Sequence, residues 1–294
     1  MARVGFLGSP EPAAICLRAL VAAGHDVALV VTEPDKRRGR GSDKSPTPVK
    51  RLASELGIPV TDRVADLLDI GADLGVVVAF GRLIRPAVLD HLLIVNVHFS
   101  LLPRWRGAAP VERAILAGDE VTGVCLMKLE AGLDTGPVYA CSETAILPEE
   151  TAPALRLRLS ALGSDLLVAH LANGVSSLGT PAPQVGDASY AAKLTPAELR
   201  IDWTRPAVDI ERLVRVGRAW TMFRGGRVII WEAGVNTGSS DAGAPPVPGT
   251  VMGGLVATGD GWLDLVSVQI EGRQRQAAAE WFRGARTAPG EAFS

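Results

Sequence analysis

The chain has 294 residues, and at about 150 residues per domain this length favours two domains. Its composition, 47% hydrophobic and 21% charged, provides enough apolar material for a packed core and excludes an intrinsically disordered chain. The 30 Lys and Arg residues nearly balance the 32 Asp and Glu residues, so the net charge of -2 excludes a general attraction to nucleic acid or anionic membranes, and any nucleic acid must bind to a local basic patch.

The first 172 residues alternate short apolar or β-branched runs with longer helical patterns, which is typical of a parallel sheet with crossover helices. The run at 74–80 is almost continuously apolar and predicts a strand buried on both faces. Strands are predicted at 3–7, 27–32, 74–80, 94–98, 123–129 and 138–146, and helices at 12–23, 48–56 and 152–172. We therefore expect a doubly wound, mostly parallel, Rossmann-like α/β domain over residues 1–185.

The composition changes after Gly174. Residues 174–189 are rich in Ser, Gly, Pro and Gln, which is typical of a connection along the surface. A helix is predicted at 207–218, followed by short strands at 228–232, 250–257 and 262–269 and by a loop at 236–249. Short strands at this spacing predict a small β-barrel, similar to an OB fold. We expect a linker at 186–205 and a C-terminal domain at 206–294.

Targeting and redox signals favour the cytoplasm. No stretch reaches the roughly 18 consecutive apolar residues of a membrane span, and Pro10 to Pro12 interrupt the N-terminus too early for a signal peptide. Cys16, Cys125 and Cys141 are odd in number and far apart in sequence, so we expect buried, reduced thiols and no metal site. We expect a cytoplasmic monomer that binds no membrane.

The stretch Ile94–Pro110 carries the first candidate site residues. Asn96 and His98 alternate on a predicted strand, so their side chains point to the same side of the sheet, near the edge where ligands bind in open α/β sheets. An amide and an imidazole there can stabilise a developing oxyanion, and the imidazole can also transfer a proton. The alternative, a pair of hydrogen-bonded structural residues, is the more common role for such side chains.

The turn Leu129–Pro137 carries a further candidate. Gly132 and Gly136 flank Asp134 and allow a sharp turn between two strands, although an ordinary Asx-turn has the same composition. If Asp134 meets the amide and imidazole at the C-terminal edge of the sheet, the three side chains supply a base, an acid and an amide donor. With no nucleophile motif in sight, such a trio suits direct transfer of an acyl-like group to an amine.

The motif NVHFSLLPRWRGAAP from Asn96, followed by GLDTGP from Gly132, closely resembles the formyltransferase family that uses 10-formyltetrahydrofolate. The resemblance covers most of the chain, including FLGSPEPA near the N-terminus and LRIDW at 199–203. It implies three catalytic residues, Asn96, His98 and Asp134, and a loop along the folate co-substrate formed by Ser100, Leu101, Leu102 and Pro103.

The implied reaction is attack by the α-amino group of methionyl initiator tRNA on the formyl carbon. Asp134 is expected to take the proton, directly or through a water, while Asn96 and a protonated His98 stabilise the oxyanion. Phe99 departs from the family pattern, in which many members have Gly, and is expected to crowd the loop beside His98.

The loop from Lys36 to Lys44 is the predicted contact with tRNA. It holds five basic residues and one Asp, so its net charge is +4 (five minus one). The family has a tRNA-gripping loop that matches Arg40, and the resemblance favours tRNA binding over a merely solvated loop. The tRNA-binding residues are therefore predicted to be Arg37, Arg38, Arg40 and Lys44.

The C-terminal domain lacks the basic charge that a tRNA-binding module would be expected to have. Residues 206–294 contain nine Arg against nine Asp and Glu, so their net charge is zero. Two other functions stay open, a formyltransferase whose acceptor is an amino-sugar nucleotide and a non-catalytic folate- or RNA-binding protein. The non-catalytic protein would be expected to lack at least one catalytic residue, and all three are present.

Overall fold

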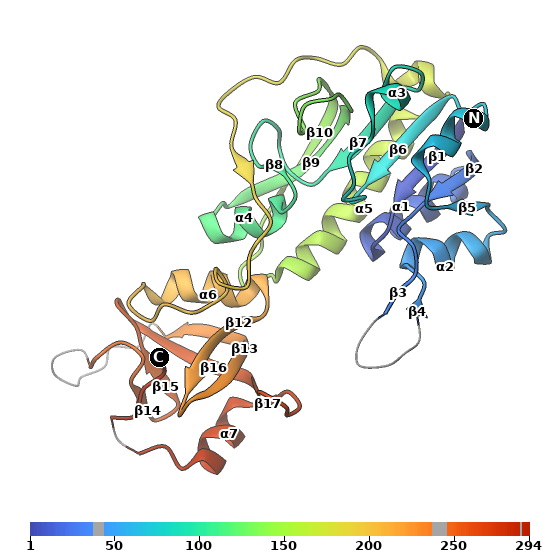
Figure 1. The fold of residues 1–294 in the computed structure, drawn as a ribbon. Helices are drawn as coiled ribbons and strands as arrows, with labels where there is room; N and C mark the ends of the chain where they lie inside the picture. The colour runs from blue at the N-terminus through green and yellow to red at the C-terminus, as the bar shows by residue number, and fades with distance from the viewer. Residues whose placement is uncertain (38–43, 237–245, 289) are drawn as a thin grey trace. The chain divides into compact units, whose positions relative to one another are not determined.

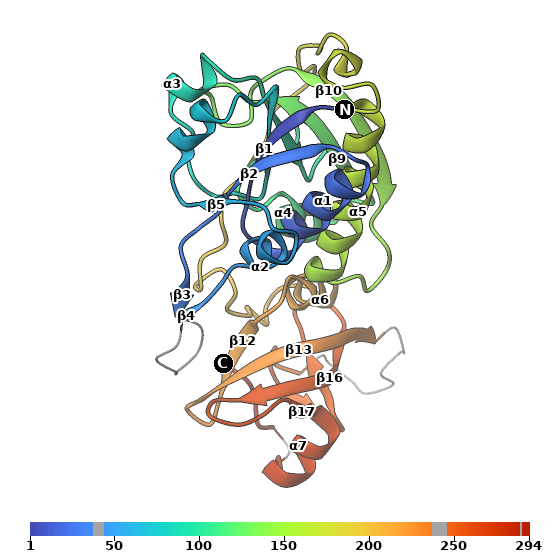
Figure 2. The ribbon, with the colours of Figure 1, turned by 90° about the vertical axis from the view of Figure 1, so that its right-hand side faces the viewer.

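The computed structural model describes residues 1–37, 44–236, 246–288 and 290–294, and the chain divides into two compact units. The first comprises Met1–Val111, Glu120–Ala145 and Ala154–Ala192, and the second comprises Glu112–Asp119, Ile146–Pro153 and Lys193–Ser294. Each unit has its own sheet (Figures 1 and 2), and each has its own hydrophobic core. The domain limits at 185 and 206 stay a prediction.

The first unit is built on a seven-stranded sheet with the order β10-β9-β7-β6-β1-β2-β5. Its strands are β1 (Arg3–Gly8), β2 (Asp26–Val31), β5 (Val60–Thr61), β6 (Leu74–Val78), β7 (Ile94–His98), β9 (Val121–Lys128) and β10 (Val138–Ala145). The four pairs among β1, β2, β5, β6 and β7 are parallel, whereas β9 runs antiparallel to both β7 and β10. The predicted mostly parallel, doubly wound sheet is confirmed.

Proline and capping signals explain where the helices of this unit begin. α2 begins at Pro48, and Thr47 caps it by accepting the Lys50 N–H on Oγ1 at 3.0 Å. α4 was not predicted, although it also begins at a proline and buries Val111, Ala114 and Ile115 at helical spacing. The helices of this unit are α1 (Glu11–Ala22), α2 (Pro48–Glu55), η1 (Val64–Asp69), α3 (Pro86–Leu89), α5 (Ala152–His170) and η2 (Val175–Leu178), whereas most of α4 (Pro110–Ala117) belongs to the second unit.

Alternation along β7 decides which face of the sheet carries the candidate residues. α5 packs on one face, because a Cβ added at Gly163 would lie 2.7 Å from the side chain of Val97. Ile94 points to the opposite face, into the core that includes residues of η1 and α3. Since successive side chains of a strand alternate, Asn96 and His98 share the face of Ile94.

The second unit contains a six-stranded antiparallel sheet with the order β12-β13-β16-β15-β14 and with β17 on β16. Trp281 anchors its core, with ring centroids 5.1 Å from Phe223 and 5.7 Å from Phe293. The predicted strand at 250–257 is two strands, because Gly253 and Gly254 make a turn with positive φ. The elements are α6 (Ala207–Val216), β12 (Ala219–Phe223), β13 (Gly226–Asn236), β14 (Val251–Met252), β15 (Leu255–Ala257), β16 (Trp262–Ile270), β17 (Gln276–Ala277) and α7 (Ala278–Ala285), of which β12, β17 and α7 were not predicted.

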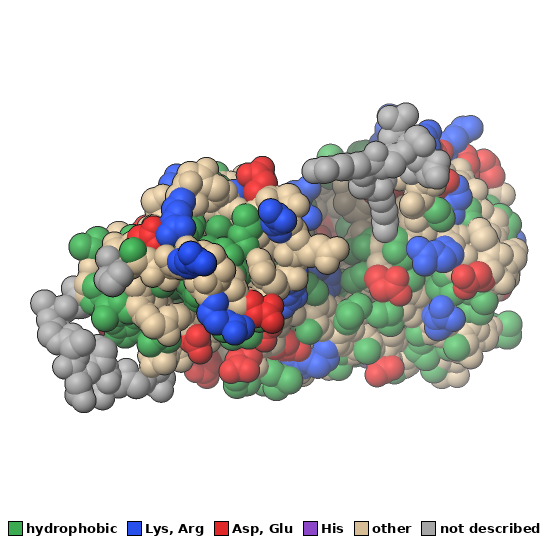
Figure 3. Space-filling model, turned by 90° about the horizontal axis from the view of Figure 1, so that it is seen from below, with side chains coloured by type: hydrophobic (Ala, Val, Ile, Leu, Met, Phe, Trp, Pro, Cys, Tyr) green, Lys and Arg blue, Asp and Glu red, His purple; other side chains and the backbone are tan. Residues whose placement is uncertain are grey.

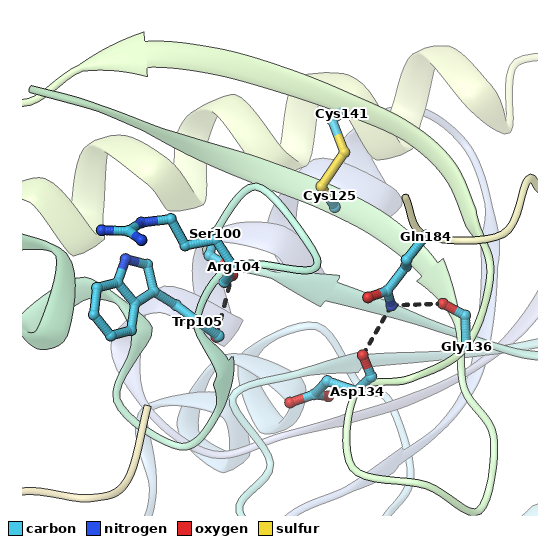
Figure 4. Close-up of a disulfide and its surroundings, with 8 residues drawn as sticks. All are labelled: Ser100, Arg104, Trp105, Cys125, Asp134, Gly136, Cys141 and Gln184. Carbon is cyan, nitrogen blue, oxygen red and sulfur yellow. Dashed lines mark hydrogen bonds between the residues drawn. A yellow bond between two sulfur atoms is a disulfide. The ribbon is translucent and has the colours of Figure 1, made fainter. Parts of the chain in front are cut away.

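The prediction of three reduced cysteines is wrong for two of them. Cys125 and Cys141 form a disulfide between β9 and β10 (Figure 4). They are register partners in the antiparallel ladder, with Cα atoms 4.1 Å apart, so strand register brings them together and their spacing along the chain gives no sign of it. Cys16 is free and buried, and burial raises the pKa of its thiol to about 11.

Candidate active site

The three predicted catalytic side chains meet at one buried point. Asn96 Nδ2 lies 3.4 Å from Asp134 Oδ1, and His98 Nδ1 lies 3.7 Å from Asp134 Oδ2. Their exposed fractions are 9% for Asn96, 5% for His98 and 8% for Asp134. The meeting that was predicted from the sequence therefore occurs, and the side chains are shielded from water.

The route by which Asp134 reaches the site differs from the predicted one. β9 runs antiparallel to β7, and its last residue, Lys128, pairs with Val95 near the start of β7. The turn that follows β9 therefore begins away from the C-terminal edge of the sheet, and Asp134 reaches Asn96 because the turn folds back over the face of β7. Strand ends alone do not place the carboxylate.

Glycines and one backbone amide hold the Asp134 turn. Asp134 has a left-handed backbone (φ 49°), which Asp tolerates better than most residues, and its Oδ2 accepts the backbone N–H of Gly107 at 2.8 Å. A Cβ added at Gly136 would overlap the carbonyl oxygen of Lys128, so the turn requires glycine at that position. The carboxylate is thus hydrogen-bonded and aimed at β7.

His98 contacts a fixed partner with each ring nitrogen. Nε2 lies 2.9 Å from the carbonyl oxygen of Trp105, which can only accept, so Nε2 carries a hydrogen and Nδ1 of the neutral ring faces Asp134. Burial lowers the pKa of His98 below its ordinary 6.5, and the opposing effects of the Asp134 charge and the Trp105 carbonyl are smaller. Burial therefore opposes the protonated form of His98 expected from the sequence, and the protonation state during the reaction stays a prediction.

The loop after β7 divides into an inward and an outward part. The Ser100 side chain is fully buried, and its hydroxyl donates to the carbonyl oxygen of Arg104 at 2.6 Å (Figure 4), so this hydroxyl braces the loop. Leu101 and Leu102 are half-buried and Pro103 is buried. Phe99, beside His98, is also buried, at 6% exposure, and its effect on a ligand stays a prediction.

The predicted tRNA-binding loop is described only at its base. β3 (Lys36–Arg37) pairs with β4 (Lys44–Ser45), Lys44 is exposed, and Lys36 forms an ion pair with Glu33 at 2.8 Å. Arg38 and Arg40 lie outside the described residues, as does the side chain of Arg37. Their role stays a prediction.

Sequence reasoning missed a second segment that contacts the site, the connection between η2 and residue 192. Ser189 Oγ accepts the Trp105 N–H at 2.9 Å, and β11 (Tyr190–Ala191) pairs with β8 (Arg106–Gly107). Gln184 donates hydrogen bonds to the carbonyl oxygens of Asp134 and Gly136 (Figure 4). The Ser, Gly and Pro residues of this segment predict a solvated connection. No local pattern indicates that the Gln184 side chain bonds to the Asp134 turn.

Neither a cluster of metal ligands nor a membrane-spanning helix occurs among the described residues. No group of three or more His, Cys, Asp and Glu side chains there is placed to hold a metal ion. No helix in those ranges is long and apolar enough to cross a membrane.

Comparison with known proteins defines the class of this protein. Residues 2–171 match the formyl transferase family and residues 193–286 match the formyl transferase C-terminal domain, so the chain belongs to the formyl transferase family and is a formyltransferase. It is 45% identical to the methionyl-tRNA formyltransferase of Ruegeria pomeroyi over 96% of this chain and 97% of that protein. It is 43% identical to the methionyl-tRNA formyltransferase of Halorhodospira halophila over 99% of this chain and 98% of that protein.

Solved structures share the fold at low sequence identity. HypX from Aquifex aeolicus in complex with tetrahydrofolic acid has a TM-score of 0.67 and 17% identity, over 99% of this chain and 48% of that chain. An N-formyltransferase from Helicobacter canadensis with folinic acid and dTDP-3-aminofucose has a TM-score of 0.66 and 15% identity, over 94% of this chain and all of that chain (100%). Methionyl-tRNA formyltransferase from Clostridium thermocellum has a TM-score of 0.57 and 13% identity, over 81% of this chain and 96% of that chain.

Proposed function

We propose that this protein transfers the formyl group of 10-formyltetrahydrofolate to the α-amino group of methionyl initiator tRNA, in the cytoplasm and as a monomer. The observation that carries the chemistry is the buried meeting of Asn96, His98 and Asp134, with 3.4 Å and 3.7 Å between the Asp134 carboxylate and the other two side chains. The choice of acceptor is supported by relatives named methionyl-tRNA formyltransferase at 41–45% identity over at least 96% of this chain.

Each of the three side chains has a role that its contacts suit. The Asp134 carboxylate takes the proton that the amine loses as it bonds to the formyl carbon, and Nδ1 of a neutral His98 lies 3.7 Å away as the next acceptor. A proton must then reach N10 of the folate, so that the bond between N10 and the formyl carbon breaks and tetrahydrofolate leaves. Asn96 Nδ2 has two hydrogens, and its contact with Asp134 at 3.4 Å uses at most one of them. The other can donate to the formyl oxygen as negative charge develops there, which is worth about 3–4 kcal/mol for such a donor.

The residues after β7 fit a folate co-substrate, which supplies the formyl group when bound. Leu101 and Leu102 offer half-buried apolar surface in the loop that directly follows the polar residues of β7. Such a combination, apolar walls beside a few oriented polar groups, is typical of small-molecule sites. Ser100 would act through the shape of the loop, since its hydroxyl is already bonded to Arg104.

Contacts between arginines and tryptophans in the second unit support tRNA as the acceptor. Basic and acidic side chains are interspersed on the face shown in Figure 3, with no broad described area of one sign. Arg227 and Arg200 nevertheless lie 4.3 Å and 5.6 Å from the Trp220 ring. Arg275 lies 5.8 Å from the Trp231 ring and also forms an ion pair with Glu232. Arginines beside aromatic rings suit RNA, which offers phosphates and bases together.

The amino-sugar acceptor is the second candidate, since sugar N-formyltransferases share the fold. These structures are only 15–21% identical to the chain, well below the relatives that are named for tRNA. Likeness at that level concerns the fold and leaves the acceptor open.

A formylation assay with purified protein tests the proposal. Charged initiator tRNA and 10-formyltetrahydrofolate are expected to give formylmethionyl-tRNA, while an amino-sugar nucleotide under the same conditions is expected to stay unmodified. Formylation of the sugar and not of the tRNA would replace the proposed acceptor. Transfer of the formyl group to neither acceptor would overturn the proposal. Light scattering of the same sample tests whether the protein is a monomer.

A further inference from the structure

Gln184 uses every hydrogen-bonding position of its carboxamide on the loops around Asp134, and Figure 4 shows the two bonds that it donates. Its Nε2 donates to the carbonyl oxygens of Asp134 and Gly136, both at 2.8 Å. Its Oε1 accepts two bonds from the Arg106 guanidinium, from Nε at 3.0 Å and from Nη2 at 2.7 Å. A carboxamide has two donor hydrogens and two acceptor lone pairs, so these four bonds determine its orientation.

These bonds close a ring around the Asp134 carboxylate. Asp134 Oδ2 accepts the N–H of Gly107, and Gly107 directly follows Arg106 in β8. Gln184 thus joins the backbone of the catalytic turn to the short strand that holds the carboxylate. A residue with a left-handed backbone, such as Asp134 at φ 49°, needs its surroundings to maintain that conformation, and the bond to its carbonyl oxygen contributes to this.

The segment that carries Gln184 is anchored on both sides. Before it, Ala182 and Val138 exchange backbone hydrogen bonds of 2.8 Å and 2.9 Å. After it, the Ser189 carbonyl oxygen accepts the Arg106 N–H at 2.8 Å. The neighbouring Val185 is 86% exposed, so the segment runs along the surface while the Gln184 side chain is bonded inward. A side chain held in this way can position another without itself reaching a substrate.

We propose that Gln184 is a positioning residue, which sets where the Asp134 carboxylate stands relative to Asn96 and His98. The inference rests on the proposed formyl transfer at this site. Without Gln184 the Asp134 carboxylate can still accept a proton, but its position changes. A displacement of about 1 Å near reacting groups can cost on the order of 10²-fold in rate. Binding of the tRNA and the folate depends on other surfaces, so the loss is expected in kcat rather than in KM.

The variant Gln184→Met tests this, because methionine has a similar length and no amide. We expect kcat to fall by about 10- to 100-fold, with KM for both substrates little changed. Val185→Ala, one residue further in the same segment, is the matched control and is expected to behave as the unmodified protein. If Gln184→Met folds poorly, Gln184→Glu keeps the size and the contact with Arg106, loses both donors, and is expected to lower kcat in the same way.

A double variant separates positioning from a general structural role. In the Asp134→Asn background the carboxylate is already gone, so adding Gln184→Met should cost little further activity. An equal loss of kcat in both backgrounds, or normal kcat in the active protein carrying only Gln184→Met, would overturn the proposal.

A readout that needs no activity distinguishes this proposal from the proposed function. The Asp134 charge raises the pKa of His98 against the effect of burial, so a displaced carboxylate should let the pKa of His98 fall in Gln184→Met, as measured by nitrogen NMR of the imidazole. An unchanged pKa of His98 would count against positioning, whichever acceptor is formylated. Failure of the unmodified protein to formylate any acceptor would instead remove the proposed function.

Discussion

The imidazole of His98 and the carboxylate of Asp134 face each other across 3.7 Å between Nδ1 and Oδ2. The opposite ring nitrogen is occupied by the Trp105 carbonyl oxygen, which leaves Nδ1 of the neutral ring as a proton acceptor directed at the carboxylate. A proton taken by Asp134 therefore has a neighbouring site to move to.

Replacing Asp134 by Asn is expected to leave the fold intact and to lower the formylation rate by about 10²- to 10⁴-fold. The amide oxygen of Asn can still accept the Gly107 N–H, but it cannot take a proton from the amine. Initial rates and the thermal unfolding midpoint should be measured together, with Glu130→Gln, an exposed carboxylate of the same turn, as the control. Near-normal turnover by folded Asp134→Asn would show that the base lies elsewhere.

The pKa of His98 is expected to lie below 6.5, because burial disfavours the charged ring. Nitrogen NMR of the labelled imidazole should also show the hydrogen on Nε2. In Asp134→Asn the pKa should fall further, because the negative charge that raises it is removed. A pKa of His98 above 6.5, or one that rises in Asp134→Asn, would contradict this assignment.

The lowered pKa of His98 also makes the stability of the protein depend on pH. Below pH 6.5 the unfolded chain binds a proton at His98 that the folded protein binds less tightly. The contribution of this residue to the free energy of unfolding is therefore complete above pH 6.5 and is lost as the pH falls from 6.5 toward the folded pKa. Denaturant unfolding of His98→Gln and of the unmodified protein across this pH range measures the effect. The loss of unfolding free energy that His98 causes at low pH should be absent from the variant.

Replacing Arg37, Arg38 and Arg40 by Ala is expected to raise KM for charged tRNA and to make it less sensitive to salt. Each lost phosphate contact should lower the salt slope of binding by about one. The KM for the folate should not change, because the charges of the loop are screened over about 10 Å at 0.1 M salt.

A variant that removes the same charge elsewhere in the first unit provides the control for the loop. Arg18, Arg82 and Arg85 are exposed, and their replacement by Ala should leave the salt slope nearly unchanged. If the loop variant binds tRNA with unchanged affinity and salt dependence, the loop is a solvated surface feature. The amino-sugar acceptor would then become the better interpretation.

The two glycines of the Asp134 turn should respond differently to substitution. Gly136→Ala places a Cβ against the backbone carbonyl of Lys128, which cannot move without shifting β9, and is expected to destabilise the protein by about 1–3 kcal/mol. In Gly132→Ala the contact is the Thr135 hydroxyl, the end of a side chain that can rotate away. Gly136→Ala should therefore lower the free energy of unfolding and the formylation rate more than Gly132→Ala does. Equal effects of the two variants would show that the turn adapts as a whole.

Local patterns along the chain determine much of this fold. The strand at Ile94–His98 and the helix beginning near Pro48 follow from alternation, apolar runs and proline, which act within a few residues. The order of apolar strands and helices predicts the parallel sheet for the same reason, since a crossover needs an intervening helix. The residue types of the site, with Asn96 and His98 two apart on one strand, were likewise visible in the sequence.

Only the tertiary structure decided how these pieces meet. The disulfide of Cys125 and Cys141 depends on the register of two antiparallel strands, and the lowered pKa of His98 depends on burial by the rest of the unit. Asp134 reaches β7 because its turn folds over the sheet, and Gln184 returns to that turn from a connection that looks solvated in sequence. These contacts join residues that are far apart in the chain. They form only when the core packs, so local sequence patterns do not predict them.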